Sequence, residues 1–223
     1  MDAAVNQDLE RRTQAERTAL SDQRMLDAAV ELICTRGAAG TTLKDVGEHA
    51  GYSRGLASYR FGNKSGLFAF ILRAIGESWL HELRHSVADK SGTAAIEAAT
   101  DAHYEFIAAD QHHIRAFYTL WFDSIGPDEE LKRLVANIHE RRRRDVEEWI
   151  TRGIEQKNIE QSVDVAGIAD QFCGGIIGLV YQWLVDPDDK KRLRQLHDTL
   201  KQQTLRLLGK SPARNNLHTE TRL

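Results

Sequence analysis

The sequence is short of the residues that build disulfide frameworks, zinc modules and turn-rich β-folds. Its 223 residues include only two cysteines and three prolines, beside 16 glycines. Cys34 and Cys173 lie far apart in the chain and belong to no metal-type spacing, which favours a reducing compartment. A sandwich or barrel with many turns would carry more proline and glycine, so their scarcity favours helices.

Long apolar runs are also missing. The longest candidate, residues 174–183, is shorter than a membrane span and contains Gln182. The first twelve residues, MDAAVNQDLERR, are polar and acidic and lack the apolar segment of a secretory signal. Hydrophobic residues make up 41% of the chain and charged residues 28%, which is enough to bury a core. We therefore expect a cytoplasmic globular protein.

Charge is not strongly of one sign, but it is unevenly placed. The formal net charge is −3, which gives no overall basic footprint. Residues 10–73, however, contain ten Lys or Arg against seven Asp or Glu. The first third of the chain therefore carries a small net positive charge.

Apolar residues recur at helical spacing along most of the chain, and no segment alternates with a period of two. Glycine, proline and short polar stretches separate the helical segments. The expected class is all-α, with about nine helices. Their approximate ranges are 21–36, 42–50, 54–61, 64–86, 93–109, 111–125, 128–153, 164–185 and 188–208.

The segment at residues 37–67 has the order of a helix-turn-helix: a short helix, a tight glycine turn and a second short helix. Gly51 lies where the chain reversal needs a positive φ. Ser53 lies where the next helix needs a side-chain acceptor for its free N–H groups, and Asn63 lies at the same position before the long helix that follows.

This segment resembles the N-terminal domain of the tetracycline-repressor (TetR) family over roughly residues 24–70. That family has a glycine, a Thr-Thr pair, Ala-Gly-Val-Ser at the turn, Gly-x-x-Tyr-x-x-Phe in the recognition helix, and Lys-x-x-Leu after it. The matching residues are Gly40, Thr41, Thr42, Ala50, Gly51, Tyr52, Ser53, Gly55, Phe61, Lys64 and Leu67. The resemblance implies a homodimer whose two recognition helices enter successive major grooves of a near-palindromic double-stranded DNA operator.

The resemblance also implies roles for individual residues. Arg54 is the expected base contact, because a guanidinium can pair bidentately with guanine. Leu56 packs on a thymine methyl group or in the core, and Lys64 holds a phosphate together with free helix N–H groups or is a plain surface lysine. The full expected DNA-binding set is Thr42, Lys44, Ser53, Arg54, Gly55, Leu56, Ser58, Tyr59, Arg60 and Lys64.

Two residues depart from the family pattern. Ser58 stands where a tyrosine is usual, so Tyr59 or Arg60 is expected to replace that phosphate contact, although Tyr59 as mere packing stays open. Gly47 stands at a usually apolar helix position, at a cost of up to about 1 kcal/mol in helix propensity against alanine.

Aromatic residues concentrate between residues 104 and 122, interleaved with polar groups. Such a stretch forms either a bundle core or a pocket for a small molecule, and the resemblance favours a pocket for an effector. An aromatic lining suits an apolar or cationic ligand. The expected ligand-binding residues are Trp79, His103, Phe106, Phe117, Tyr118, Trp121, Phe122, Trp149 and Phe172. The helix spacing also resembles the choline-responsive betaine-regulator branch, which ranks quaternary amines first as candidate effectors.

The last two long helices carry broad apolar faces, and Gly174, Gly175 and Gly178 permit close helix approach, either between two copies or within one chain. The expected domains are a flexible arm at 1–18, the helix-turn-helix domain at 19–66, an effector-binding and dimerisation domain at 67–209, and a disordered tail at 210–223.

The function expected on these grounds is a ligand-responsive transcriptional regulator, a repressor that leaves its operator when an effector binds. We expect no metal and no cofactor, because His81 and His85 share a helix face without further ligands. We expect no enzyme, since no nucleophile–base pair or phosphate loop is visible. The alternative is an all-helical small-molecule-binding protein or enzyme that uses the aromatic pocket without binding DNA.

Overall fold

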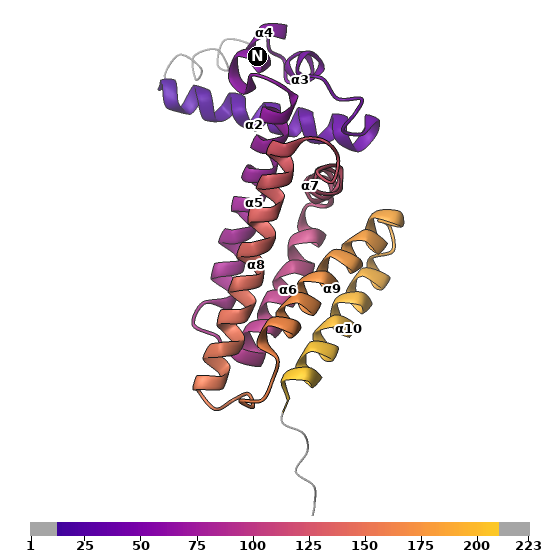
Figure 1. Ribbon diagram of the computed structural model, residues 1–223. Coiled ribbons are helices and arrows are strands. Elements are labelled where there is room, and N and C mark those ends of the chain that lie inside the picture. The colour runs from indigo at the N-terminus through magenta and orange to yellow at the C-terminus, as the bar shows by residue number, and fades with distance from the viewer. Residues whose placement is uncertain (1–12, 210–223) are drawn as a thin grey trace, which may run out of the picture. The chain divides into compact units, whose positions relative to one another are not determined.

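The computed structural model describes residues 13–209, and within them it contains helices and no strands. The expected arm (residues 1–12) and tail (residues 210–223) lie outside these residues. The predicted all-α class is confirmed (Figure 1). The helices are α2 (Gln14–Arg36), α3 (Leu43–His49), α4 (Arg54–Phe61), α5 (Lys64–Val87), α6 (Gly92–Ala109), α7 (Gln111–Asp123), α8 (Glu129–Glu155), α9 (Val165–Val185) and α10 (Lys190–Leu208).

The chain divides into two compact units. The first contains the residues up to His81 together with Phe106–Ile138, and the second contains Glu82–Glu105 together with the residues from His139 onward. The helix-turn-helix therefore shares a unit with α7 and with the first part of α5. Helices α5, α6 and α8 supply residues to both units.

Helix α2 begins seven residues earlier than the expected start at Ser21, so residues 14–18 are helical and are not a frayed arm. The cause is a capping box: the Thr13 hydroxyl accepts from the Glu16 N–H at 3.2 Å, and the Glu16 carboxylate accepts from the Thr13 N–H at 2.7 Å. The apolar stripe of α2, which includes Met25, Ala29 and Ile33, is buried as its spacing predicts.

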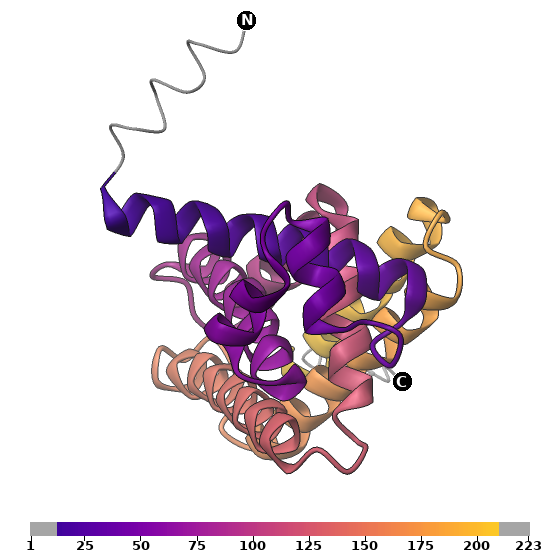
Figure 2. The same ribbon diagram turned by 90° about the horizontal axis from the view of Figure 1, so that it is seen from above.

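Helices α3 and α4 form the predicted helix-turn-helix, and both lie next to α2 in Figure 1; Figure 2 gives the view from above. Gly51 has a φ of +78°, as the turn requires. A side chain at Gly47 would place its Cβ 3.0 Å from the Ser53 carbonyl oxygen and 3.6 Å from the Ala57 Cβ. The absence of a side chain at Gly47 therefore permits close contact between α3 and α4, and the lower helix propensity of glycine is the cost of that contact.

The first turn of α5 is held by several neighbours. The Asn63 side chain accepts from the Gly66 N–H at 2.8 Å, as predicted for a cap. A Cβ on Gly66 would lie only 2.1 Å from the Phe61 carbonyl oxygen at the end of α4. The Ser65 hydroxyl donates to Asp128 at 2.5 Å, and the same carboxylate accepts the Leu131 N–H at the start of α8. The beginning of α5 thus fixes α4 and α8.

In the second unit, α9 packs along α10 (Figure 1). A Cβ on Gly175 would meet Leu200 at 2.5 Å, so this glycine serves packing within the chain. At Gly174 and Gly178, in contrast, a Cβ would meet nothing within 4 Å. Of the three glycines that the sequence assigns to close helix approach, only Gly175 is used within one chain.

Among the described residues, α9 alone is long and apolar enough to cross a membrane, with a mean hydropathy of 1.3. Seven of its residues, including Phe172 and Trp183, are buried, and the helix lies against α10. These contacts are those of a core helix.

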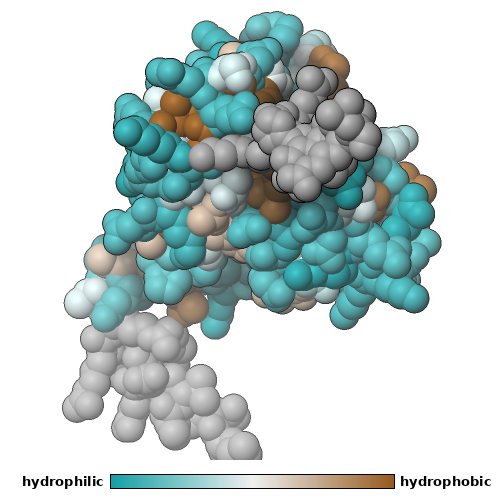
Figure 3. Space-filling view, turned by 90° about the horizontal axis from the view of Figure 1, so that it is seen from below, coloured by the Kyte–Doolittle hydropathy of each residue, from teal (hydrophilic) through white to brown (hydrophobic). Residues whose placement is uncertain are grey.

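The face in Figure 3 is mostly hydrophilic, with small and separate hydrophobic patches.

We predict that Gly66→Ala destabilises the protein by about 2 kcal/mol or more, because the new methyl group overlaps a backbone oxygen that cannot rotate away. Gly55→Ala is the matched control, since a Cβ there meets nothing within 4 Å. It should instead stabilise α4 by up to about 1 kcal/mol. Urea unfolding followed by circular dichroism measures both, and equal free energies of unfolding would contradict the packing described.

Candidate functional site

Helix α4 turns one continuous face away from the protein. Successive residues are about 100° apart around a helix, which places Arg54, Gly55, Ser58 and Tyr59 on one side and Ala57 on the other. Ala57 is fully buried against α3, whereas the Tyr59 side chain is 88% exposed. We call Arg54, Gly55, Ser58 and Tyr59 the α4 outer face. All four belong to the residues that the sequence assigns to DNA binding, and a major groove accommodates such a helix.

The two arginines of α4 are held by carboxylates from different helices. The Arg54 Nε donates to Glu48 of α3. The Arg60 guanidinium binds Asp22 of α2, with a distance of 2.8 Å between Arg60 Nε and Asp22 Oδ1. That hydrogen bond raises the pKa of Arg60 above its ordinary value. Arg60 therefore fastens α4 to α2 and lies off the outer face.

Three other predicted DNA contacts lie near the ends of these helices. The Thr42 hydroxyl caps α3 by accepting from the Asp45 N–H at 3.2 Å, and Lys44 is exposed in the first turn of α3. Ser53 occupies the N-cap position of α4, but its side chain makes no capping hydrogen bond, so that part of the prediction is wrong. Ser53 is exposed, and its backbone is extended as is usual for an N-cap residue. Leu56 is half-buried, so its exposure is compatible with both expected roles, packing on a thymine methyl group and packing in the core.

Lys64 is more than a surface lysine. Its Nζ donates to the Ala39 carbonyl oxygen at 2.8 Å and lies 5.4 Å from the centre of the Phe68 ring. The ammonium group thus joins the start of α5 to the loop between α2 and α3, beside the helix-turn-helix. Its positive charge remains where the sequence places it, at the N-terminus of a long helix.

An aromatic cluster in the first unit contains most of the predicted ligand-binding residues. Trp79 of α5 contacts Phe106 at 5.3 Å between ring centres. In α7, Phe117 contacts Tyr118 at 5.1 Å and Trp121 at 5.6 Å. Trp79, Phe117, Tyr118 and Trp121 are buried, and Phe106 is half-buried. Phe122, the sixth predicted ligand-binding residue in this unit, is also half-buried.

The other three predicted ligand-binding residues, His103, Trp149 and Phe172, belong to the second unit. His103 of α6 is buried and hydrogen-bonded to buried His197 of α10, with 2.9 Å between His103 Nδ1 and His197 Nε2. His197 Nδ1 lies 2.8 Å from the Leu193 carbonyl oxygen, so it carries a proton and His103 donates to His197. Burial lowers the pKa of both histidines, so both are neutral.

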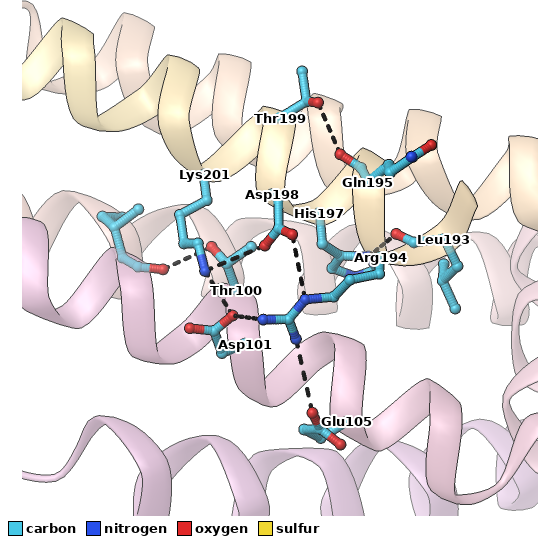
Figure 4. Close-up of polar contacts among 11 residues, drawn as sticks. Thr100, Asp101, Glu105, Leu193, Arg194, Gln195, His197, Asp198, Thr199 and Lys201 are labelled. Carbon is cyan, nitrogen blue, oxygen red and sulfur yellow. Dashed lines mark hydrogen bonds and ion pairs between the residues drawn. The ribbon is translucent and has the colours of Figure 1, made fainter. Parts of the chain in front are cut away.

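Charged residues of α6 and α10 form a network of ion pairs beside His197 (Figure 4). Asp101 accepts from Lys201 at 2.7 Å and pairs with Arg194 at 3.3 Å. Arg194 also lies 3.4 Å from Asp198 and 4.7 Å from the centre of the Tyr104 ring. These contacts could not be predicted from sequence patterns, because the two helices are about 90 residues apart in the chain. Within residues 13–209, no group of three or more His, Cys, Asp or Glu side chains could hold a metal ion.

Comparison with known proteins agrees with this geometry. Residues 25–71 match the family model described as bacterial regulatory proteins, tetR family. The HTH-type transcriptional regulator BetI of Burkholderia thailandensis is 28% identical over 112 residues, which are 49% of this chain and 57% of BetI. The HTH-type transcriptional repressor KstR2 of Rhodococcus jostii is 32% identical over 114 residues, 51% of each chain. The matched regions thus span about half the length of these relatives.

Solved structures share the fold over most of the chain. The SmeT–triclosan complex has a TM-score of 0.71 at 21% identity and covers 86% of this chain and 93% of its own. FadR of Bacillus subtilis in complex with stearoyl-CoA has a TM-score of 0.70 at 17% identity and covers 82% and 96%. Over residues 25–71 the chain is similar to the TetR family, and over most of its length it shares the all-α fold of these solved structures.

The histidine pair predicts a pH dependence of stability. Both folded pKa values lie below the ordinary value of 6.5, so stability is fully present above about pH 6.5 and falls as the unfolded chain takes up protons below it. Each histidine contributes up to about 1.4 kcal/mol per pH unit.

The check is urea unfolding between pH 7.5 and 5.5 for the wild type and for His103→Gln, whose amide can still donate to His197. We expect a shallower loss of stability in His103→Gln. His85→Gln removes an exposed histidine of the same unit and should keep the wild-type slope. Identical slopes in all three proteins would show that the pair is protonated in the folded state.

Proposed function

We propose that this protein is a homodimeric, sequence-specific transcriptional regulator, a repressor that releases a palindromic DNA operator when a small effector binds. The observation that carries the proposal is the α4 outer face. An eight-residue helix turns a base-reading arginine, a glycine and an almost fully exposed tyrosine to solvent, and α2 and α3 hold it from behind. The family match over residues 25–71 supports the same role.

Phosphate contacts would come from the edges of this face. Ser53 leaves the N-terminal N–H groups of α4 without a side-chain cap, which suits an approaching phosphate. Lys44 and Lys64 would bind the backbone on either side, and Thr42 would add a hydroxyl. With Ser58 in place of the usual tyrosine, Tyr59 would supply the phosphate contact, whereas the bond to Asp22 makes Arg60 a poorer substitute.

A dimer is needed because one short helix, α4, contacts too few base pairs for tight specific binding. We assign the contact between copies to α9 and α10. Tyr181 and Val185 of α9 and Leu207 of α10 are large hydrophobic residues with at least half of their surface exposed. Gly174 and Gly178, which have open space beside them, would let a second copy approach closely.

Effector control would use the aromatic cluster and α5. Lys64 at the start of α5 contacts the helix-turn-helix, and Trp79, about 22 Å further along the same helix, contacts Phe106. A ligand that separates these rings moves the far end of a rigid helix, and with it the first turn that holds α4. The triclosan and stearoyl-CoA complexes of SmeT and FadR support a small-molecule role for this fold.

The matched relatives are transcriptional regulators, which supports a protein without catalytic activity and a cytoplasmic location, where its DNA lies. The alternative from the sequence, a helical ligand-binding protein or enzyme without DNA binding, predicts that no duplex is bound specifically.

Lys64 provides the first test. Selection of bound duplexes from a random pool should enrich a palindrome, and Lys64→Ala should weaken binding to all duplexes and reduce the slope of log affinity against log salt by about one. Lys132→Ala is the control, because this exposed lysine forms an ion pair with Glu129 of its own helix, at 3.6 Å. A base-specific defect in Lys64→Ala would contradict its role at the phosphate backbone.

Effector linkage provides the second test. A panel of quaternary amines and apolar aromatic compounds is titrated against the fluorescence of the buried Trp79 and Trp121, with and without operator. We expect one class to bind more weakly when operator is present, and to weaken operator binding by the same factor, because linkage is reciprocal. Equal effector affinities in the two states would contradict effector control.

A further inference from the structure

One ion pair of the helix-turn-helix lies on its exposed surface. The Nε–H of Arg54, the first residue of α4, donates to the carboxylate of Glu48 near the end of α3. Both side chains face solvent: Arg54 is 72% exposed and Glu48 is 42% exposed. An exposed pair of this kind contributes little to stability. Its effect is instead to hold one end of a long and flexible side chain on the α4 outer face.

The ion pair with Glu48 uses the Nε edge of the Arg54 guanidinium. A guanidinium has five N–H donors in a plane, one on Nε and four on the two terminal nitrogens. Glu48 occupies the Nε side, and the high exposure of Arg54 leaves the terminal nitrogens facing solvent. Guanine presents two acceptors, O6 and N7, to the major groove, and the two terminal nitrogens of an arginine match their spacing.

The second arginine of α4 shows the contrast. Arg60 donates to Asp22 through both Nε and a terminal nitrogen, at 2.8 Å and 2.5 Å, and Asp22 is only 19% exposed. This two-bond contact to a largely covered carboxylate fixes Arg60 against α2, away from the outer face. Only Arg54 therefore combines an oriented guanidinium with a solvent-facing terminal end.

We propose that Glu48 is a positioning residue that orients Arg54 to read a guanine in each half of the operator. This inference rests on the proposed function and adds the base that is read and the residue that sets its specificity. An arginine that is already oriented loses less conformational freedom when it binds. A carboxylate close to DNA would otherwise weaken binding, because it repels phosphate. Positioning and simple repulsion therefore predict different results when Glu48 is removed.

The test measures discrimination at one base pair. The operator is first selected from a random duplex pool with the wild-type protein. Discrimination is the ratio of the Kd for an operator with that guanine replaced by 7-deazaguanine, which lacks the N7 acceptor, to the Kd for the intact operator. The guanine read by Arg54 is the one whose ratio falls to about 1 in Arg54→Ala, from a wild-type value of about 5 to 150.

Glu48→Ala should lower this ratio at least about fivefold while binding to random-sequence duplex stays equal or becomes tighter. Glu48→Gln, which keeps an acceptor for Nε, should retain more of the ratio than Glu48→Ala. In the Arg54→Ala background, Glu48→Ala should change the ratio no further, because the two residues act as one unit. Glu31→Ala is the matched control: it removes an exposed carboxylate of the same domain whose partner is His49, and it should keep the wild-type ratio.

The outcomes separate the two claims. A wild-type protein that enriches no sequence overturns the proposed function and this inference together. An enriched operator whose discrimination survives Glu48→Ala overturns the inference alone, as does an equal gain in affinity for all sequences without loss of discrimination. A ratio that falls equally in Glu31→Ala means that negative charge alone matters, and this result also overturns the positioning role.

Discussion

The first turn of α5 is the constraint on which the DNA-binding half of the molecule depends. Gly66 presses against the last carbonyl of α4, and Asn63 caps the turn from the loop before it. Lys64 and Ser65, the first two residues of the helix, bind the α2–α3 loop and the start of α8. Four consecutive positions, 63–66, therefore fix the recognition helix from one side while Arg60 and Asp22 fix it from the other.

This arrangement would let one domain both read DNA and respond to a ligand, as we propose. A rigid helix runs from the turn that holds α4 to the rings around Trp79, within one compact unit. Glu48 binds Arg54 and Asp22 binds Arg60, and in the function that we propose the first arginine would read DNA while the second anchors α4. Specificity for a DNA sequence and control by an effector would thus depend on the same few residues near helix ends.

Most of the fold could be predicted because its signals are local. Asn63, Gly51 and the Thr42–Asp45 pair mark helix ends within four residues, and the helices begin and end close to their expected positions. The Thr13–Glu16 capping box was also local but was missed, because the polar residues around it hid the start of α2. The contacts between distant helices, His103–His197 and Arg60–Asp22, could not be predicted, since pairing across 94 or 38 positions leaves no periodic trace in one sequence.

We infer that the outer face of α4 enters the major groove of an operator. A crystal structure of the protein bound to the duplex selected by it tests this most directly. We predict two copies on one duplex, α4 of each in the major groove, and the terminal nitrogens of Arg54 within hydrogen-bond distance of a guanine. A complex in which α4 lies outside the groove, or in which Arg54 contacts no base, would contradict the account.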